Sequence, residues 1–432
     1  MNAVSPVTVP LSEGAFALTF ALLLVAPLAL AGVALINTGL GRSRSAAQSL
    51  LGNLAIIAVT AIVFAPIGAG VAGTLSGAGV SFHAAGKFWN WIGSGPFLLR
   101  QLAAAPLQNQ LSLLFEFPAV AMAALIPWGS GADRWRLVAG CAAAAVLAVF
   151  VFPLLVHWMW AGGWLAQLGV NFGLGAGFVD PGGAASVHVL GGLSALAVIW
   201  IIGPRKGKFP KEGLSTAIPG HNAAYVLFGC LISLVGWLAW NTAGAVIWLH
   251  AAPAALPATA ISTLLCASGA LIATFAVTRI RFGKPDASLC ANGWLAGLVA
   301  SSACAALITP QEAMFVGLTV GIVTPLLVEL FELALSIDDP SGAIAVHAVA
   351  GLWGLLAAGI FAPQPGQLLA QLLGIAALLG VVLPLVYFIF TVLNLVVRFR
   401  VDADGERVGM DLHELGGGAY PEFVVHRDES YR

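Results

Sequence analysis

Charged residues are scarce in this chain, and their scarcity excludes an ordinary water-soluble domain. Asp, Glu, Lys and Arg make up 9% of the 432 residues, whereas hydrophobic residues make up 59%. A soluble domain carries roughly 25% charged residues. The composition therefore predicts a polytopic membrane protein whose helices are solvated by lipid. The formal net charge is −1, which argues against a nucleic-acid partner because such proteins carry basic surfaces.

Metal-ligand patterns are also lacking. The cysteines are scattered through apolar runs without the spacing of a metal site, so they are interpreted as small packing residues rather than disulfides. The sequence contains no His-Glu-x-x-His or Glu-x-x-His pattern of a zinc or di-iron site. We therefore predict no metal and no cofactor, and an intramembrane enzyme is the weakest of the alternatives. The cysteines are Cys141, Cys230, Cys266, Cys290 and Cys304.

Long apolar runs are abundant instead. A helix needs roughly 20 apolar residues to cross the hydrocarbon core, and about eleven runs reach that length. They are too long for barrel strands, so the expected fold is an all-α bundle, and the 51 glycines suit close helix packing in lipid. The runs lie near 13–38, 48–72, 104–128, 136–157, 184–204, 222–245, 257–279, 289–306, 312–335, 342–362 and 369–397.

Basic residues predict the topology. They follow the first, third, fifth, seventh and eleventh runs, whereas the opposite loops hold only Lys87 and Arg100. Because Lys and Arg remain cytoplasmic, the N-terminus is expected outside and the C-terminus inside. The basic residues are Arg42, Arg44, Arg134, Arg136, Arg205, Lys206, Lys208, Lys211, Arg279, Arg281, Lys284, Arg398 and Arg400.

The runs divide into two sets of five that enter the membrane from opposite sides, followed by one extra helix. This arrangement predicts a 5+5 inverted repeat within a transmembrane domain that covers residues 1–397. Repeat one covers about 13–204, repeat two about 222–362, and the extra helix about 369–397. Residues 398–432 form a charged tail that is expected in the cytoplasm.

One stretch occurs twice. Residues 180–193 and 339–352 share Asp, Pro, Gly, Ala, Val, His, Gly and Leu at the same offsets, and their histidines are 159 residues apart. Matched segments in two halves of a membrane protein indicate a structural repeat with a site at its axis. We therefore expect His188 and His347 to meet near that axis.

The two histidines admit two interpretations. A histidine inside a membrane is a functional-site candidate, but a single one often only joins two helices by a hydrogen bond. Their equivalent positions favour function. Two neutral imidazoles share one proton and offer hydrogen bonds to a small polar molecule in an apolar passage, whereas two histidines alone are a poor metal-ligand set.

Each histidine is preceded by an Asp-Pro pair. Asp180 and Asp339 are expected to be helix N-caps, with the proline at the first helical position. Asp180 then lies at the outer end of its helix and Asp339 at the inner end, as an inverted repeat requires. Asp180 would also attract cations to the outer mouth.

Two outer loops, 73–103 and 158–182, are rich in glycine and aromatic residues. The general interpretation of these rings is an interfacial aromatic belt. The rings are Phe88, Trp89, Trp91, Trp158, Trp160 and Trp164.

Several further motifs occur along nearly the whole chain. They are Asp180 to His188 leading to Gly203–Gly207, Asp338-Asp339-Pro340 leading to His347, Trp160–Gly163, Gly236-Trp237 with Asn241, Gly131–Arg134, and the tail Gly409–Leu412 with Ala419-Tyr420. Together these motifs resemble the ammonium transporter (Amt/Mep/Rh) family.

The resemblance implies a homotrimer with one narrow, mainly apolar pore in each subunit. It assigns a twin-His pair in the pore to His188 and His347. It also implies an outer recruitment site at which Trp160 captures ammonium by a cation–π contact, worth ~0.5–2 kcal/mol. Asp180 matches the acidic residue of the family near that mouth.

The outer vestibule departs from the family pattern. The family's two stacked phenylalanines fall on Ala119 and Trp240, and Phe115 is the nearest remaining ring. A serine that helps to hold ammonium falls on Gly244, and Glu116 stands where glutamine is common. The pore centre thus resembles the family, while the vestibule does not.

The expected function is ammonium uptake through the plasma or inner membrane. An ion in a low-dielectric passage loses hydration worth several kcal/mol. Ammonium escapes that cost by losing a proton near Trp160 and Asp180, and potassium cannot. The alternatives are an ammonium sensor on the same scaffold and a channel for another small neutral molecule, such as methylamine or carbon dioxide.

The resemblance also implies a cytoplasmic PII-type regulatory partner that docks on Arg205 to Lys211 and the tail.

Overall fold

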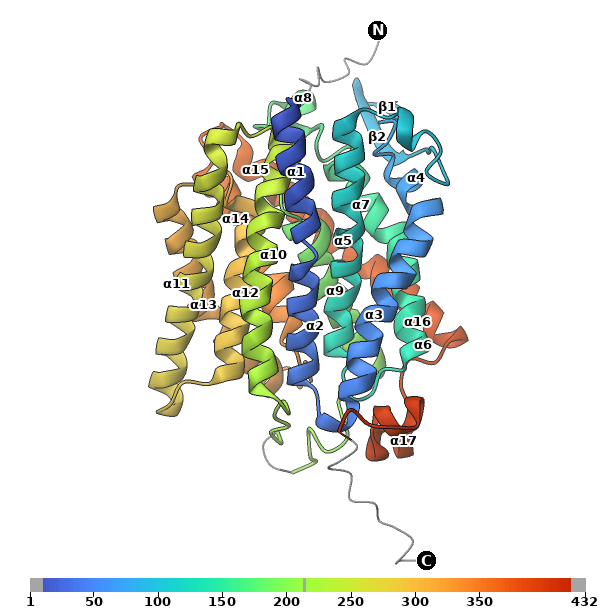
Figure 1. Ribbon diagram of the computed structural model, residues 1–432, viewed down its shortest axis with the longest axis vertical. Helices are drawn as coiled ribbons and strands as arrows, with labels where there is room; N and C mark the ends of the chain where they lie inside the picture. The colour runs from blue at the N-terminus through green and yellow to red at the C-terminus, as the bar shows by residue number, and fades with distance from the viewer. Residues whose placement is uncertain (1–10, 213–214, 421–432) are drawn as a thin grey trace, which may run out of the picture.

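The computed structural model describes residues 11–212 and 215–420. In that part of the chain, eleven helical segments are long and apolar enough to cross a membrane. Their bounds lie within a few residues of the predicted runs, so the all-α membrane fold is confirmed. Figure 1 shows them standing side by side as one bundle.

The first repeat contains five spans and the elements that join them. They are α1 (Glu13–Val25) with α2 (Leu28–Leu40); η1 (Ser43–Ser45), α3 (Ala46–Val63), η2 (Phe64–Gly68) and α4 (Ala69–Ala72); β1 (Gly79–Ala84), β2 (Lys87–Gly93) and η3 (Leu102–Ala104); α5 (Leu107–Ser130); α6 (Leu137–Val146), η4 (Leu147–Val151) and α7 (Phe152–Met159); α8 (Leu168–Phe172); and η5 (Ala184–Val189) with α9 (Leu190–Ile202).

The second repeat, the extra helix and the tail follow in the same order. They are α10 (Ala223–Leu249); η6 (Pro253–Ala255) with α11 (Leu256–Phe282); α12 (Ala287–Cys304); α13 (Pro310–Leu333); η7 (Ile344–Val349) with α14 (Ala350–Phe361); α15 (Gln367–Ala377), η8 (Leu378–Val382) and α16 (Leu383–Val396); and α17 (Ala403–Val408) with η9 (Asp411–Leu415).

Small residues set the spacing of the helices. Where α2 and α10 pack together, a Cβ atom on Gly32 would lie 2.5 Å from the carbonyl oxygen of Gly229, and one on Gly236 would lie 2.0 Å from the backbone nitrogen of Ala29. Van der Waals packing of close backbones holds membrane helices together, because lipid supplies no hydrophobic drive between them. The glycines are therefore interface residues.

A β-hairpin lies at one end of the bundle, which we call the hairpin end (Figure 1). The sequence predicted only loops in this region, and that prediction was wrong for β1 and β2, which pair antiparallel. Aromatic residues in β2 favour the extended conformation. The two turn residues, Ala85 (φ 51°) and Gly86 (φ 69°), both have the positive φ of a two-residue hairpin turn. Ala-Gly is not a common sequence for such a turn, so the signal was weak.

The opposite end, which we call the basic end, gathers loops that lie far apart in the sequence. Arg42, Arg134 and Arg205 are joined there through Asp133 and Asp338, and α17 lies at the same end in Figure 1. The loops after the first, third and fifth spans are therefore on one side. Which side is cytoplasmic stays a prediction.

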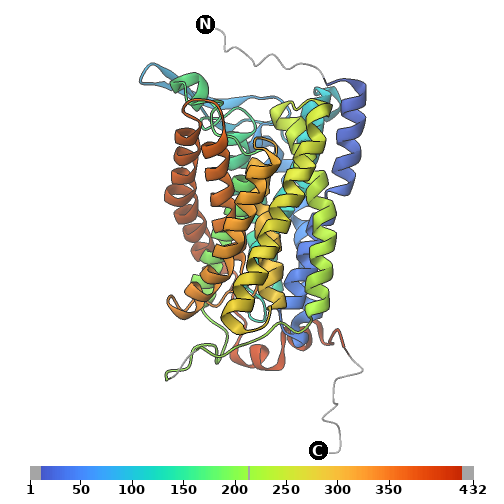
Figure 2. The ribbon, with the colours of Figure 1, turned by 90° about the vertical axis from the view of Figure 1, so that its left-hand side faces the viewer.

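The two repeated helices run in opposite directions. The helix η5–α9 begins near Trp160 and ends at Gly203, beside Arg134 of the basic end. The helix η7–α14 begins at the basic end, next to Asp338. The last span, α15 to α16, packs against α9 on the outside of the bundle, on the side away from α1 (Figure 2).

Candidate functional site

Two buried histidines lie side by side where the repeated helices cross. The Nδ1 atoms of His188 and His347 are 3.3 Å apart, and their ring centroids are 5.3 Å apart at an angle of 22°. The rings are 2% and 3% exposed. Trp237 of α10 stacks on the other side of the pair, 5.2 Å from His188. The structure thus brings the two imidazoles together, as the repeat predicts.

Glycines allow the two helices to meet at this point. A Cβ atom on Gly192 would lie 2.4 Å from the backbone nitrogen of Ala348, and one on Gly351 would lie 2.8 Å from a side-chain carbon of Val189. Both histidines lie in π-helical turns, η5 and η7. Such turns are frequent at functional sites, because they displace side chains from the regular helical position.

The facing ring nitrogens restrict the protonation of the pair. A hydrogen bond between two nitrogens needs one N–H donor and one lone-pair acceptor. The contact therefore requires one imidazole to carry its proton on Nδ1 and the other to carry it on Nε2. The ring that is protonated on Nε2 can donate a hydrogen bond there, and the ring that is protonated on Nδ1 can accept one at its Nε2, so the pair can both donate to and accept from a small polar molecule.

Each histidine helix starts on an aspartate that precedes it. The carboxylate of Asp180 accepts hydrogen bonds from the backbone N–H of Ala185 (3.1 Å) and from the N–H and O–H of Ser186 (2.9 and 2.8 Å). At the equivalent offset, Asp339 accepts from the N–H of Ile344 (2.9 Å). It also accepts from the hydroxyl of Ser130 (2.7 Å). Both carboxylates therefore satisfy free amides at a helix start.

The geometry differs from the expected cap in one respect. The proline does not occupy the first helical position, because a turn separates each Asp-Pro pair from its helix. Gly183 (φ 80°) and Gly342 (φ 66°) close the two turns. These equivalent glycines adopt a left-handed conformation that favours glycine, and they fold the carboxylate back over the helix start.

Asp180 is turned away from the mouth. It is 3% exposed, and its carboxylate faces the helix amides rather than solvent. Its backbone oxygen accepts a hydrogen bond from Nε1 of Trp160 (2.7 Å). Asp180 therefore positions Trp160, and its charge is not presented at the surface.

Four aromatic rings pack together between Asp180 and the hairpin end. We call these four rings the mouth cluster. Phe115 lies 5.4 Å from Trp160 and 4.9 Å from Trp240, measured between ring centroids. The sequence predicted these three residues but missed the fourth, Trp248, which stacks on Trp160 at 4.8 Å and 13°. Trp240 and Trp248 are both in α10, eight residues apart, so the two-turn spacing was the available signal.

Three further vestibule residues are also placed by the structure. A Cβ atom on Gly244 would lie 2.1 Å from the carbonyl oxygen of Pro181, which explains why serine is absent there. Ala119 is fully buried in α5, one turn beyond Phe115. Glu116 is also fully buried, and one carboxylate oxygen accepts the hydroxyl of Thr74 at 2.5 Å.

The rings predicted to form an interfacial belt pack mainly on one another. Trp91 lies 5.3 Å from Trp158 and 5.7 Å from Trp164, and Trp158 is 2% exposed. Beneath the hairpin, His157 lies 2.9 Å from the carbonyl oxygen of Ala72 and 3.0 Å from Oδ1 of Asn90. His157 joins α7 to the hairpin, a role that its sequence context did not predict.

A buried ion network lies at the basic end. Arg205 pairs with Asp338 at 2.8 Å and with Asp133 at 3.1 Å. Arg134 donates to the carbonyl oxygens of Gly203 and Asp338, both at 2.8 Å. Burial alone would raise the pKa of Asp338, but the charge of Arg134 and the hydrogen bonds and charge of Arg205 outweigh it and lower that pKa to about 2.

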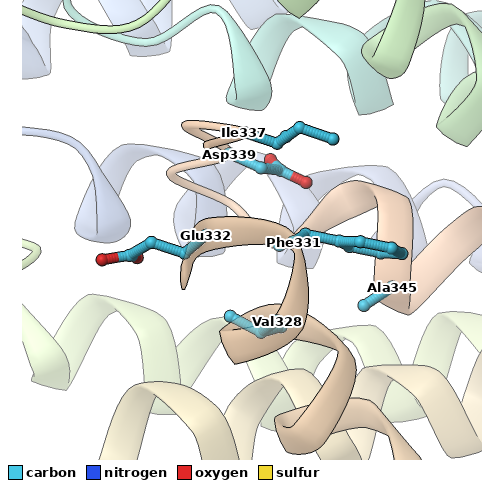
Figure 3. Close-up of a pocket in the computed structure, with 7 residues that line it drawn as sticks. Val328, Phe331, Glu332, Ile337, Asp339 and Ala345 are labelled. Atoms are coloured by element: carbon cyan, nitrogen blue, oxygen red, sulfur yellow. The ribbon is translucent and has the colours of Figure 1, made fainter. Parts of the chain in front are cut away.

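A small pocket opens beside the start of the second histidine helix (Figure 3). Its volume of about 10 Å³ is close to that needed for one water molecule. The side chain of Phe331 extends toward Ala345, two residues before His347. The lining residues are Val328, Phe331, Glu332, Ile337, Asp339, Gly342 and Ala345.

The described residues hold no group of three or more His, Cys, Asp or Glu side chains that could bind a metal. All five cysteines are free thiols. The paired histidines lie on two helices that enter the bundle from opposite ends.

These features define a class: an all-helical, multi-pass membrane protein built as an inverted repeat around a histidine pair. The chain belongs to the Ammonium Transporter Family, whose family model matches residues 15–420.

Two relatives and one solved structure show the extent of the similarity. The chain is 31% identical to "Ammonium transporter Amt2" of Archaeoglobus fulgidus, over 92% of this chain and 86% of the relative. It is 33% identical to "Ammonium transporter Amt2" of Haloferax mediterranei, over 91% and 87%. It is also similar to the solved structure "Sensor Amt Protein", with a TM-score of 0.84 and 27% identity, over 93% of this chain and 98% of that one.

Proposed function

We propose that this protein transports ammonium across a membrane, and that its cargo passes the histidine pair as ammonia. The observation that carries the proposal is the contact between His188 and His347 at 3.3 Å, in the middle of a chain whose relatives are named ammonium transporters. The site offers positions for hydrogen bonds but holds no nucleophile or metal set, so we infer conduction rather than catalysis.

The selectivity follows from the cost of dehydration. Both histidines are almost fully buried, and a cation beside them would lose hydration worth several kcal/mol. Ammonium avoids that cost by giving its proton to solvent water at the mouth, whereas potassium has no proton to lose. The paired rings then provide one donor and one acceptor for ammonia.

The test replaces both histidines by alanine. His188→Ala with His347→Ala is expected to abolish ammonium-selective flux in proteoliposomes, measured with an internal pH dye, because the hydrogen-bonding positions are lost. The matched control is His83→Ala with His250→Ala, since these histidines are exposed. Ammonium flux that stays unchanged in the first variant, with potassium still excluded, would sink the proposal.

An ammonium sensor is the second candidate, and a specific observation favours it. Trp248 covers one face of Trp160 at 4.8 Å, which leaves less room at the mouth for rapid entry. The "Sensor Amt Protein" is one of the structures this chain resembles. Growth rescue of a cell that lacks ammonium uptake separates the two functions, because a transporter restores growth on low ammonium and a pure sensor does not.

We also propose that the protein assembles as a homotrimer in the membrane. Its outer helices expose large apolar side chains, such as Leu54 (63%), Ile62 (75%) and Leu395 (81%), which need lipid or another subunit as a neighbour. Native mass spectrometry of the purified protein in mild detergent measures the number of subunits directly. A monomer would contradict this proposal.

The docking of a PII-type protein at the basic end is part of the same proposal. Arg205 and Lys208 are buried, and they pair with Asp338 and Glu332, so they do not offer free charges to a partner. Lys206 and Lys211 are exposed and remain the docking candidates of this loop. A pull-down with a purified PII-type protein, repeated with both lysines changed to alanine, tests this assignment.

A further inference from the structure

The mouth cluster contains three indole rings, and two of them are fixed by hydrogen bonds. Nε1 of Trp160 donates to the backbone oxygen of Asp180 (2.7 Å). Nε1 of Trp240 donates to the backbone oxygen of Gly182 (2.9 Å). Nε1 of Trp248 is buried and has no hydrogen-bond partner among the described residues. Trp248 is therefore the ring of the three that no hydrogen bond ties to its neighbours.

Trp248 covers one face of Trp160, the ring on which a cation would bind. Its ring is nearly parallel to that of Trp160, with centroids 4.8 Å apart, so the two rings are in contact and no ion fits between them. A cation–π contact requires the ion itself to lie on the ring face. Phe115 meets Trp160 at 84° and Trp248 at 87°, and thus packs against both members of the stack.

No hydrogen bond restrains the side chain of Trp248 among the described residues. It lies in the last turn of α10, which ends at Leu249, and His250 after it has a left-handed φ of 52°. The nearest tether is on the backbone, where Nε2 of Gln108 donates to the carbonyl oxygen of Ile247 (3.2 Å). The backbone is held, while the side chain can change its rotamer without breaking a hydrogen bond.

We propose that Trp248 is a lid that determines substrate affinity: its indole occupies the face of Trp160, and ammonium or methylammonium binds there after the lid swings away. This inference rests on the proposed function. Ammonium must replace an indole–indole stack by a cation–π contact of similar strength. Binding in the wild type is therefore weaker than on an open Trp160.

The test compares Trp248→Ala with the wild type. Without the stack, the ammonium concentration that gives half-maximal current in proteoliposomes should fall roughly two- to tenfold. This range corresponds to the free energy of one aromatic pair. The half-saturating concentration of methylammonium should fall by at least the same factor, because a larger cation needs more of the vacated space. The matched control is Trp200→Ala, since Trp200 is 51% exposed on α9 and its ring packs on Tyr387.

A double variant separates a lid from a structural residue. If Trp248 acts by covering Trp160, then Trp248→Ala should give no gain in ammonium affinity in the Trp160→Leu background. An equal gain in both backgrounds would overturn the proposal, as would an unchanged or higher half-saturating concentration in Trp248→Ala alone. A higher value would instead make Trp248 part of the capture surface.

A binding measurement keeps the lid distinct from the transport function. The thermal shift of each purified protein in ammonium chloride is compared with that in potassium chloride. If the wild type and Trp248→Ala both lack ammonium current and ammonium-driven pH change, but Trp248→Ala gains an ammonium-specific thermal shift, the lid stands and transport fails. If both proteins lack current and pH change and their thermal shifts are equal, both inferences fail. If both conduct with equal affinity, only the lid fails.

Discussion

Single residues explain why the vestibule departs from the family pattern while the pore centre keeps it. The backbone of Gly244 is pressed against Pro181, in the turn that holds Asp180. The ring of Trp240 is oriented by a hydrogen bond to the same turn. These two positions are thus coupled to the segment that starts the first histidine helix. Gly244 and Trp240 thus both pack on the same turn, and the contact between the histidines is still formed.

Restoring the family's serine at position 244 is expected to destabilise the protein. A Cβ atom there would lie 2.1 Å from the carbonyl oxygen of Pro181, and such overpacking costs about 1–3 kcal/mol. Gly244→Ser should therefore lower the thermal unfolding midpoint of the detergent-solubilised protein. Gly380→Ser is the control, because nothing lies within 4 Å of that Cβ position. Equal midpoints for the two variants would refute this account of Gly244.

The predictability of the site also varies by residue. The sequence predicted that His188 and His347 would meet, because identical offsets in two repeats can be seen without a structure. It could not predict that Trp248 lies on Trp160, because this contact depends on how α10 packs beside the loop that holds Trp160. It also placed the charge of Asp180 at the mouth, whereas the left-handed Gly183 turns the carboxylate into the helix.

At the scale of elements, free helix starts at the basic end are satisfied by carboxylates of the tail. Asp411 accepts hydrogen bonds from the backbone N–H groups of Ala47 (3.1 Å) and Gln48 (2.7 Å), at the start of α3. Glu414 accepts from the N–H of Leu137 (3.1 and 3.0 Å), at the start of α6. The tail is therefore fixed to two spanning helices by the same chemistry that caps the histidine helices.

Removing these two carboxylates is expected to release the tail. Each cap contributes about 1 kcal/mol, so Asp411→Ala with Glu414→Ala should speed proteolytic cleavage after Val408 several-fold, while the spans stay intact. Asp404→Ala is the control, because its side chain is 85% exposed. Limited proteolysis followed by mass spectrometry measures the rate. Cleavage at the wild-type rate in the double variant would show that other contacts hold the tail.

Elements were predicted best where they are long and apolar. All eleven spans could be located from run length alone, because the membrane imposes it. The hairpin was missed because two short strands leave only a weak periodic signal, and its Ala-Gly turn is uncommon. The π-helical turns η5 and η7 were also not predicted, since an extra residue in a helical turn leaves hydrophobicity unchanged.

At the scale of the whole molecule, the buried ion network joins the two repeats at the basic end. Arg205 follows the first histidine helix, and Asp338 precedes the second, and they pair at 2.8 Å. Asp133 and Arg134, from the loop after α5, complete the network. Arg134 and Arg205 are two of the basic residues that predicted the topology, yet both are buried. They therefore contribute to tertiary structure as well as to orientation.

This network predicts a pH dependence of stability. The pKa of Asp338 is lowered from 3.8 to about 2, so its ionised form stabilises the folded state by about 2 kcal/mol at neutral pH. Because the folded pKa is the lower one, this contribution is complete above about pH 4. It is lost as the pH falls toward 2.

The variant Asp338→Asn isolates that contribution. Its unfolding midpoint should lie below that of the wild type at pH 7, and the difference should shrink between pH 4 and pH 2.5. Thermal unfolding followed by tryptophan fluorescence gives both midpoints. Asp404→Asn, at an exposed position, should match the wild type throughout. A difference that stays constant down to pH 2.5 would show that Asp338 acts through something other than its charge.

We propose that this protein is an ammonium-selective pathway through the histidine pair. The most direct test applies an ammonium pulse and then a potassium pulse to wild-type proteoliposomes on a solid support, with a pH dye inside parallel vesicles. We expect an ammonium-specific response, either a current or an electroneutral pH change, and none with potassium. Equal responses to both ions, or no response in either assay, would contradict the claim.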